Sequence, residues 1–390
     1  MGSRTESLPT LRWGIIGAGL ISSWFTKDIT LPRRSPAALH KIQAVGSSTS
    51  AQKANEFVKT HLSHLTPAPK TYGTYEEVYS DPEVDIIYIG TPHALHKSQC
   101  LSAIRANKHV LCEKAFTLNA SEAREVLDAA REEGVFIMEA MWTRFLPVTR
   151  ALQKALHEER VIGDVRRVFC DFGLDMQVQT LEGSSRLRDA RLGAGSLLDL
   201  GVYALTWGVF VLEAPSCVKS DSEDGKRERK RERERQKPEI IASQVLQDGV
   251  DIASTFVLKY PATGKIGILS SSVEFKTPEA FMRIEGSEGV VVVEGVATSK
   301  PRAFTVYRKG TAGAGAGAEK ECEKYEVEVE GMGFHFEADA VAQSIFLGLR
   351  ENEVMDHAET LRVMEMLDEI RAQGGARFPG EDESLSDLVR

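Results

Sequence analysis

The sequence lacks the cysteine pattern of a disulfide-stabilised or zinc-binding protein. Its cysteines are odd in number, widely scattered and never spaced as Cys-x-x-Cys: Cys100, Cys112, Cys170, Cys217 and Cys322. The pattern therefore indicates neither a disulfide framework nor a structural zinc site. A reducing, cytoplasmic setting is the simplest expectation.

Long apolar runs and an excess of basic charge are missing as well. No apolar run reaches the roughly 20 residues that cross a bilayer, and the polar segment Met1–Thr10 has no apolar core of the kind found in signal peptides. We therefore expect no membrane partner. The formal net charge of −9 argues against general nucleic-acid binding, because phosphate binding requires a basic face.

The length of 390 residues predicts two domains, and the pattern changes near Leu146. In residues 1–145 short apolar runs alternate with helical stretches. Strands are expected at Arg12–Ile16, Lys41–Gly46, Val84–Gly90, His109–Cys112 and Val135–Met141, and helices at Ala51–His61, His93–Ala106 and Asn119–Glu132. This alternation predicts right-handed crossovers and a doubly wound parallel sheet, the Rossmann arrangement.

Residues 146–390 are expected to form an α+β domain built on one large sheet. Helices are expected at Val148–Glu159, Gly195–Leu212, Phe334–Arg350 and Ala358–Gln373, and strands at Val165–Leu174, Ile240–Leu246, Ile252–Tyr260, Lys265–Val273, Phe281–Glu285, Val290–Val296 and Phe304–Arg308. Strands that follow one another without helices should pair antiparallel.

Two low-complexity stretches interrupt this second domain. A loop at 219–238 contains Lys226–Arg235, ten consecutive charged residues of which seven are basic. Its position inside a domain favours a solvated loop over a nucleic-acid or targeting patch. The Gly/Ala run Thr311–Ala318 is typical of a flexible hairpin tip.

The first strand ends in the glycine turn Gly17-Ala18-Gly19-Leu20-Ile21-Ser22. Glycines at its first and third residues allow a tight turn and a close backbone approach to a pyrophosphate, and the next helix offers free N–H groups. Ser22 replaces the third glycine of the usual pattern, which is acceptable if the helix still packs closely. Because the turn joins a strand to a helix, dinucleotide binding is favoured over a merely structural turn.

The second strand ends in Ser47-Ser48-Thr49, where NAD-preferring sites usually place Asp or Glu. These hydroxyl groups, with Lys53 one turn later, suit the 2′-phosphate of NADP. The alternative is that Ser48 or Thr49 is simply the N-cap of the following helix.

Lys114, Asp199 and Tyr203 could carry chemistry. Lys114 ends a predicted strand at the carboxyl edge of the sheet, although it could also be a surface lysine paired with Glu113. Asp199 and Tyr203 are four residues apart on a predicted helix and therefore share a face. The alternative for Tyr203 is a core tyrosine with a satisfied hydroxyl group.

A family resemblance rests on several motifs together. They are Gly17-Ala18-Gly19, Gly90-Thr91-Pro92-His93 with His96, Cys112-Glu113-Lys114-Ala115, Glu139-Ala140-Met141-Trp142-Thr143-Arg144-Phe145 and Leu198-Asp199-Leu200-Gly201-Val202-Tyr203. The chain resembles the Gfo/Idh/MocA oxidoreductases from about Leu11 to Gly374. Within that family it is similar to the branch of dimeric dihydrodiol dehydrogenases and fungal NADP-dependent D-xylose 1-dehydrogenases. One departure is Ala115, where the wider family usually has proline, often after a cis bond.

The resemblance implies roles for matching residues. Tyr203 would accept the substrate hydroxyl proton. A free phenol titrates at about 10, so the Lys114 cation is expected to favour the phenolate. Asp199 would orient Lys114 or bind a sugar hydroxyl. The implied cofactor-binding residues are Gly17, Gly19, Leu20, Ile21, Ser47, Ser48, Thr49, Lys53, Thr91, Pro92, His93, His96, Glu113, Lys114, Trp142 and Arg144. The spacing of His93 and His96 could suggest a metal, but no third ligand is in sight and none is expected.

The implied function is NADP-dependent oxidation of the anomeric hydroxyl of D-xylose, or of a similar aldopyranose, to the lactone. A trans-1,2-dihydrodiol dehydrogenase and a catalytically inactive, dinucleotide-sensing regulator are the alternatives. The resemblance also implies a homodimer that covers the outer face of the second sheet. The sequence does not assign the residues that recognise the substrate hydroxyls; Asp175, Arg186 and Phe334 are candidates.

Overall fold

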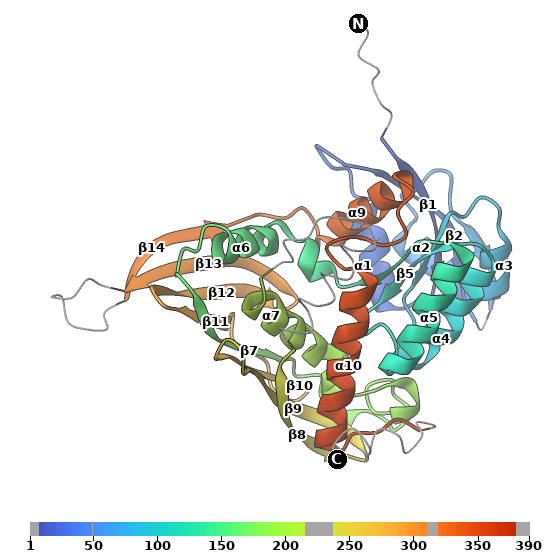
Figure 1. Cartoon of the computed structure of the whole chain (residues 1–390). Helices are drawn as coiled ribbons and strands as arrows, with labels where there is room; N and C mark the ends of the chain where they lie inside the picture. Colours follow the sequence, from blue (N-terminus) through green and yellow to red (C-terminus); the bar gives the residue numbers. More distant parts are fainter. Residues whose placement is uncertain (1–7, 49, 215–236, 310–318, 380–390) are drawn as a thin grey trace, which may run out of the picture. The chain divides into compact units, whose positions relative to one another are not determined.

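The computed structural model of the chain describes residues 8–48, 50–214, 237–309 and 319–379 (Figure 1). The chain divides into two compact units, Met1–Leu146 with Val329–Met364 and Pro147–Glu328 with Glu365–Arg390. The charged run Lys226–Arg235 and the Gly/Ala run Thr311–Ala318 lie outside the described residues, so their predicted loops stay predictions.

Within the described residues, the first unit contains a six-stranded sheet in the order β3-β2-β1-β4-β5-β6. Its strands are β1 (Thr10–Ile16), β2 (Leu39–Gly46), β3 (Lys70–Tyr72), β4 (Ile86–Ile89), β5 (His109–Glu113) and β6 (Ile137–Ala140). All neighbouring strands are parallel. The strand order reverses between β1 and β4, which confirms the predicted doubly wound sheet and directs attention to the carboxyl ends of its strands.

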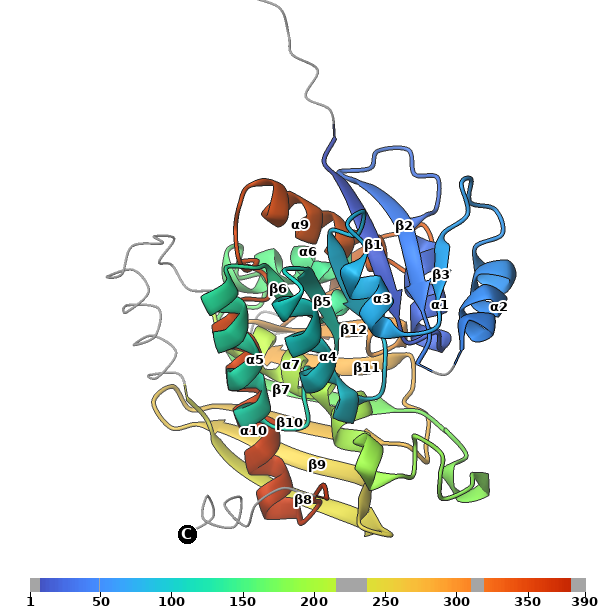
Figure 2. The same ribbon diagram turned by 90° about the vertical axis from the view of Figure 1, so that its right-hand side faces the viewer.

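The helices of the first unit cover both faces of this sheet. They are α1 (Leu20–Ile29), α2 (Ala51–His61), α3 (Tyr75–Ser80), α4 (His93–Arg105), α5 (Ala120–Glu133), α9 (Phe334–Phe346) and the start of α10 (His357–Gly374). Figure 2 shows α4 and α5 side by side over one face. Local signals explain the ends of α5: Asn119 accepts a hydrogen bond from the Glu122 N–H, and Gly134 ends the helix with a φ of +66°.

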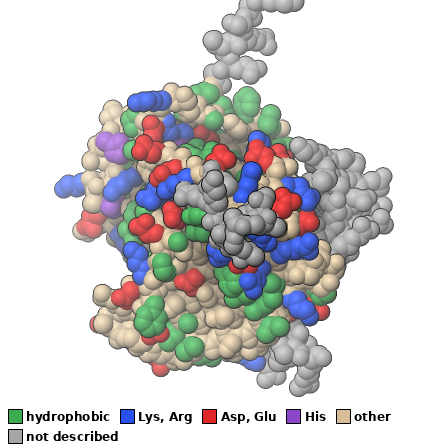
Figure 3. Space-filling view, turned by 90° about the vertical axis from the view of Figure 1, so that its left-hand side faces the viewer, with side chains coloured by type: hydrophobic (Ala, Val, Ile, Leu, Met, Phe, Trp, Pro, Cys, Tyr) green, Lys and Arg blue, Asp and Glu red, His purple; other side chains and the backbone are tan. Residues whose placement is uncertain are grey.

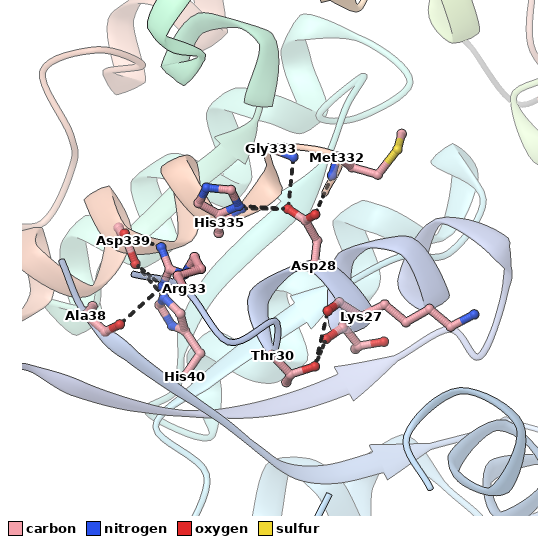
Figure 4. A network of polar contacts seen from close by, with 11 residues as sticks. Lys27, Asp28, Thr30, Arg33, Ala38, His40, Met332, Gly333, His335 and Asp339 are labelled. Atoms are coloured by element: carbon pink, nitrogen blue, oxygen red, sulfur yellow. Dashed lines mark hydrogen bonds and ion pairs between the residues drawn. The ribbon is translucent and has the colours of Figure 1, made fainter. Parts of the chain in front are cut away.

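Residues 329–364 pack with the first unit, whereas the sequence-based division assigns them to the second domain. The Asp339 carboxylate on α9 accepts hydrogen bonds from both terminal nitrogens of Arg33, at 2.6 and 2.9 Å, and lies 2.8 Å from His40 Nε2 (Figure 4). Trp13 Nε1 donates to the other ring nitrogen of His40 at 3.2 Å. The contacts of Asp339 with Arg33 and His40 join segments about 300 positions apart, a separation that local sequence patterns do not encode.

The described part of the second unit contains an eight-stranded sheet in the order β14-β13-β12-β11-β7-β10-β9-β8. Its strands are β7 (Val165–Gly173), β8 (Glu239–Gln247), β9 (Val250–Tyr260), β10 (Lys265–Ser272), β11 (Ala280–Gly286), β12 (Gly289–Ala297), β13 (Lys300–Lys309) and β14 (Glu319–Glu326). The sheet is mainly antiparallel, as predicted. The exception is the parallel pair of β7 and β10, because β7 inserts between β10 and β11.

Helices α6 (Pro147–His157) and α7 (Val202–Leu212) also belong to the second unit, and α7 packs on β7 and β10. Gly208 allows the close approach: a Cβ there would lie 2.6 Å from Leu269 Cδ1. Among the described residues, Ala190–Leu212 is the one helical stretch with the length and hydropathy of a membrane span, but its apolar window is completely buried inside the protein. The buried core helix of a globular protein can have the same length and hydropathy as a membrane span.

Candidate active site

Gly17 makes the sharp turn after β1. Its φ is +84°, and an added Cβ would lie 2.6 Å from the Gly90 carbonyl oxygen, so both conformation and space require glycine. The Ser22 hydroxyl donates to the Gly17 carbonyl at 2.5 Å. Gly90 leaves room for this hydroxyl, because a Cβ at Gly90 would lie 2.2 Å from Ser22 Oγ. The serine in place of a third glycine is thus accommodated within the turn.

Gly19 has a different reason to be glycine. It precedes α1 as its N-cap, has an ordinary extended conformation, and makes no side-chain capping bond. Apart from Gly19 and its two chain neighbours, no atom of the described residues lies within 4 Å of a Cβ built on it. The open space faces a helix N-terminus, where backbone N–H groups and the helix dipole favour an anion. This cradle fits the pyrophosphate of a dinucleotide.

The end of β2 presents the hydroxyl groups expected to recognise a ribose. Ser47 is buried, and its N–H donates to the Tyr72 carbonyl at 3.2 Å. Ser48 and Lys53 are exposed, and Thr49 lies outside the described residues. The N-cap of α2 is Ser50, which accepts a hydrogen bond from the Lys53 N–H, so Ser48 does not serve as the cap.

The segment after β4 contacts the segment after β5 through two histidines. His93 Nε2 lies 3.2 Å from the Lys114 carbonyl oxygen. His96 Nδ1 lies 3.1 Å from the Ala115 carbonyl, and its Nε2 lies 2.9 Å from the Thr91 carbonyl. Burial and then the neighbouring His93 lower the pKa of His96 to about 4. Both rings are therefore engaged with backbone carbonyls.

Lys114 directly follows β5, and the Lys114–Ala115 peptide bond is cis although residue 115 is alanine. The preceding Glu113 is buried, and the Tyr88 hydroxyl donates to its carboxylate at 2.6 Å. Burial raises the pKa of Glu113, and the Lys114 cation and the Tyr88 hydrogen bond oppose that effect. The strand thus ends in a buried carboxylic acid, Glu113, followed by the partly exposed Lys114.

The short helix after β6 carries Trp142 and Arg144. The Trp142 ring packs on Phe334 of α9, with 4.6 Å between ring centroids. Arg144 donates to Glu359 at 2.9 Å, so at least one of its terminal nitrogens is engaged with the protein. Sequence reasoning gave no role to Glu139, at the end of β6, where burial raises the carboxyl pKa to about 7.

The proposed cofactor-binding residues of the first unit thus follow the carboxyl ends of five strands: Gly17 after β1, Ser47 after β2, Thr91 after β4, Lys114 after β5 and Trp142 after β6. Because the strands are parallel, these ends lie on one edge of the sheet. Spacing along the sequence does not reveal this convergence, but the strand assignments do.

Asp199 and Tyr203 belong to the second unit, at the start of its buried helix. Asp199 lies in a π-helical turn, Leu197–Gly201, and Tyr203 in the first turn of α7. Such turns are frequent at functional sites. Tyr203 packs edge-to-face on Phe172 at 5.5 Å between ring centroids. Both side chains are almost fully buried.

The buried Asp251 carboxylate anchors the start of this turn. It accepts hydrogen bonds from the Leu197 N–H at 2.7 Å and from Ser196 Oγ at 2.8 Å. Burial raises the pKa of Asp251 to about 6. The Arg186 guanidinium approaches Asp199 from a preceding loop, at 3.3 Å. Sequence reasoning did not find Asp251, since it lies on β9, more than 50 residues away.

Comparison with protein families gives two adjoining matches. Residues 11–141 match the model described as "Oxidoreductase family, NAD-binding Rossmann fold", and residues 150–292 match the "GFO/IDH/MocA C-terminal domain".

Curated relatives match over nearly the whole chain. The D-xylose 1-dehydrogenase (NADP(+)) of Hypocrea jecorina is 32% identical over 95% of this chain and 93% of the relative. The trans-1,2-dihydrobenzene-1,2-diol dehydrogenase of Bos taurus is 34% identical over 95% of this chain and 98% of the relative. A solved 3-ketoreductase from Actinomadura kijaniata, in complex with NADP and TDP-benzene, superposes with a TM-score of 0.71. It is 21% identical and covers 94% of this chain and 98% of its own, which supports the fold alone.

Proposed function

Because the chain belongs to the Gfo/Idh/MocA oxidoreductase family, we propose that it oxidises the anomeric hydroxyl of D-xylose, or of a similar aldopyranose, to the lactone with NADP. The observation that carries this proposal is the full-length similarity to an NADP-dependent D-xylose 1-dehydrogenase. Lys114, Asp199 and Tyr203 are all present in this chain, as catalysis would require.

NADP, when bound, supplies the acceptor for the hydride that leaves the substrate carbon. The open cradle at Gly19 and the N-terminus of α1 would hold the pyrophosphate. Ser47, Ser48 and Lys53 would hold the 2′-phosphate, and the absence of an acidic residue after β2 supports NADP over NAD. Thr91, Pro92 and His93, after β4, would line the nicotinamide ribose, and Trp142 and Arg144, after β6, would lie beside the cofactor.

The protein's own side chains would move the proton. Tyr203 would take the proton of the substrate hydroxyl as the hydride leaves the same carbon. The Lys114 cation would hydrogen-bond the substrate oxygen and favour the tyrosinate. We propose the two groups as one acid–base unit and assign the role of formal base to neither of them alone. Asp199 would bind a substrate hydroxyl or orient Lys114.

A second candidate function is oxidation of trans-1,2-dihydrodiols, favoured by 34% identity to the bovine enzyme. Both substrates present adjacent hydroxyls on a six-membered ring. A catalytically inactive regulator is the third candidate, and the presence of both Lys114 and Tyr203 argues against it, because a sensor needs neither.

We also propose a cytoplasmic homodimer formed through the outer face of the second-unit sheet. On that face a hollow of about 410 Å³ is lined by residues that include Phe169, Ile268 and Val292. Ile241 and Val245 on β8 are 61% and 58% exposed. Apolar side chains on an uncovered sheet face favour burial against a second copy. Sedimentation should detect a dimer; a monomer at every concentration would contradict this.

No nucleic-acid partner is proposed. The chain is acidic, with a net charge of −9, and basic and acidic side chains are interspersed on the face shown in Figure 3. Among the described residues of this face, mixed charge of this kind does not provide the continuous basic surface that a phosphate backbone requires. The expected partner is a small-molecule substrate.

NADPH formation by the purified protein, measured across aldopyranoses and trans-dihydrodiols, tests the proposed function. We expect the highest kcat/KM with D-xylose or a close relative, and a higher value with NADP than with NAD. A higher kcat/KM with dihydrodiols would favour the second candidate. No turnover with any of these substrates would contradict the enzyme and favour the regulator.

A further inference from the structure

The loop between β7 and the π-helical turn of the second unit carries three arginines with different surroundings. Arg188 donates through both terminal nitrogens, to the Leu181 carbonyl and to Asp248, each at 2.7 Å. Arg191 donates from Nε and Nη2 to Asp189, at 2.9 and 2.7 Å. Both guanidinium groups are thus held by the loop and its neighbours through two nitrogens.

Within the described part of the chain, Arg186 is held through one guanidinium nitrogen alone. Its Nη1 lies 3.3 and 3.4 Å from the two carboxylate oxygens of Asp199. Among the described residues, its Nε and Nη2 have no hydrogen-bond partner. The Arg186 side chain is 54% exposed, whereas that of Asp199 is 7% exposed. An exposed guanidinium thus lies against a buried carboxylate, and its Nε and Nη2 remain available to donate hydrogen bonds.

The geometry of this pair is unlike that of a stabilising ion pair. Strong arginine–carboxylate pairs are bidentate, with two parallel bonds near 2.8 Å. Here one nitrogen reaches both oxygens at long distances, and exposed pairs of this kind stabilise proteins by only about 0–1 kcal/mol. The contact places the guanidinium beside Asp199 while leaving most of its hydrogen-bonding capacity unused.

Resting on the proposed function, we propose that Arg186 is a substrate-binding residue that makes the site selective for a neutral polyhydroxyl ring. Nε and Nη2 donate to ring hydroxyl oxygens, and Asp199 accepts from a neighbouring hydroxyl. A hydroxyl group both donates and accepts, so an arginine–aspartate pair complements two or more hydroxyls beside the one that is oxidised.

The charges of the pair favour neutral sugars over two other classes of substrate. An arginine alone would attract a carboxylate, but the adjacent Asp199 repels an anion and leaves the pair neutral overall. An aromatic dihydrodiol has only one hydroxyl beside the one that is oxidised, and Asp199 accepts from it, so no further hydroxyl is left for Arg186. An aldopyranose has further hydroxyls, and these can satisfy the remaining donors of Arg186.

Substitution of Arg186 tests this proposal. For Arg186→Met we expect kcat/KM with D-xylose to fall about 10- to 100-fold, mainly through KM, the range expected for losing hydrogen bonds to a charged group. The kcat/KM with a trans-dihydrodiol and the KM for NADP should change far less. Arg186→Lys keeps the charge but not the planar guanidinium, so its kcat/KM with D-xylose should lie between those of the wild type and Arg186→Met. Arg191→Met on the same loop is the matched control, and its kcat/KM with D-xylose should equal that of the wild type.

Two results would overturn the proposal. One is equal loss with the sugar and the diol, which would make Arg186 a general support of Asp199. The other is unchanged kcat/KM with D-xylose, which would make it a surface ion pair. A failure of the proposed function is distinguishable, because the wild-type protein itself would then show no NADP-dependent oxidation of sugars.

Discussion

Asp28 on α1 caps the N-terminus of α9 by accepting two hydrogen bonds from His335. The backbone N–H and ring Nδ1 of His335 both lie 3.1 Å from Asp28 Oδ2, and the Gly333 N–H lies 3.0 Å from the same oxygen (Figure 4). Gly333 precedes α9 without a side-chain cap of its own. The first turn of α9 therefore receives its cap from a helix about 300 residues earlier, and this turn places Phe334 against Trp142.

Asp28→Asn should destabilise the first unit by about 1–3 kcal/mol, because a buried charge-assisted cap is lost. Burial alone raises the pKa of Asp28, but the hydrogen bonds from His335 and Met332 outweigh it, and the net pKa is lowered. The stabilisation is therefore present above the ordinary carboxyl pKa and is lost as the pH falls below it. Urea unfolding at several pH values should show the largest difference from wild type near neutrality. Asp128→Asn, at an exposed pair with Arg131, should have little effect.

Gly17→Ala and Gly19→Ala should separate the structural glycine from the one that faces the cofactor. The first substitution forces a φ of +84° on alanine and a contact with the Gly90 carbonyl, so it should lower Tm. The second meets open space in an ordinary conformation, so Tm should stay the same. If a pyrophosphate approaches Gly19, its methyl group should raise the dissociation constant for NADP several-fold. An unchanged dissociation constant for NADP in Gly19→Ala would show that the pyrophosphate does not bind beside Gly19.

Gly195→Ala should lower kcat without preventing cofactor binding. Gly195 has a φ of +142°, and its Cβ would lie 2.1 Å from Asp251 Oδ1. The methyl group would displace the carboxylate that anchors Ser196 and Leu197, and with them the turn that carries Asp199. Gly249→Ala is the matched control: Gly249 has a φ of +82°, but beyond its chain neighbours no atom of the described residues lies within 4 Å of an added Cβ. Equal kcat values for the two variants would show that the Asp251 anchor does not matter.

Glu337→Gln should stabilise the protein increasingly as the pH rises. Glu337 on α9 is completely buried, and neither carboxylate oxygen has a hydrogen-bond partner among the described residues. Burial, followed by repulsion from Glu113 and Asp28, raises its pKa well above the usual range. Wild-type stability therefore falls by up to about 1.4 kcal/mol per pH unit between the unfolded and folded pKa values. Glutamine removes this dependence. Urea unfolding at pH values near 5 and near 8 gives the free energy of unfolding of both proteins. An equal difference between wild type and Glu337→Gln at the two pH values would contradict the account.

Local sequence signals predicted most elements of the first unit, because a helix cap or a regular apolar period marks where these elements begin and end. Helix α2 has the predicted bounds, since Ser50 caps it and its apolar face recurs at the helical period. The short elements β3 and α3 were not predicted. A capping box formed by Thr74 and Glu77 was visible in the sequence for α3, but three residues are too few to show the period of β3.

Relationships between distant segments were less accessible to prediction. The parallel pairing of β7 with β10 depends on β7 entering the middle of the sheet, and nothing in either strand encodes its neighbour. The association of residues 329–364 with the first unit depends on Asp28 and on the pair of Arg33 with Asp339. Glu337, Glu139 and Asp251 were missed because an acidic residue reveals its burial only in the folded chain.

The central claim is that Tyr203 and Lys114 act as the acid–base pair of an NADP-dependent sugar dehydrogenase. Its most direct test is the kcat of Tyr203→Phe with D-xylose at saturating NADP, compared with the wild type, with Lys114→Met measured alongside. We expect each substitution to lower kcat by about 100-fold or more, the scale of lost general-base catalysis, without weakening NADP binding in Tyr203→Phe. A kcat of Tyr203→Phe within a few-fold of the wild type would contradict the account.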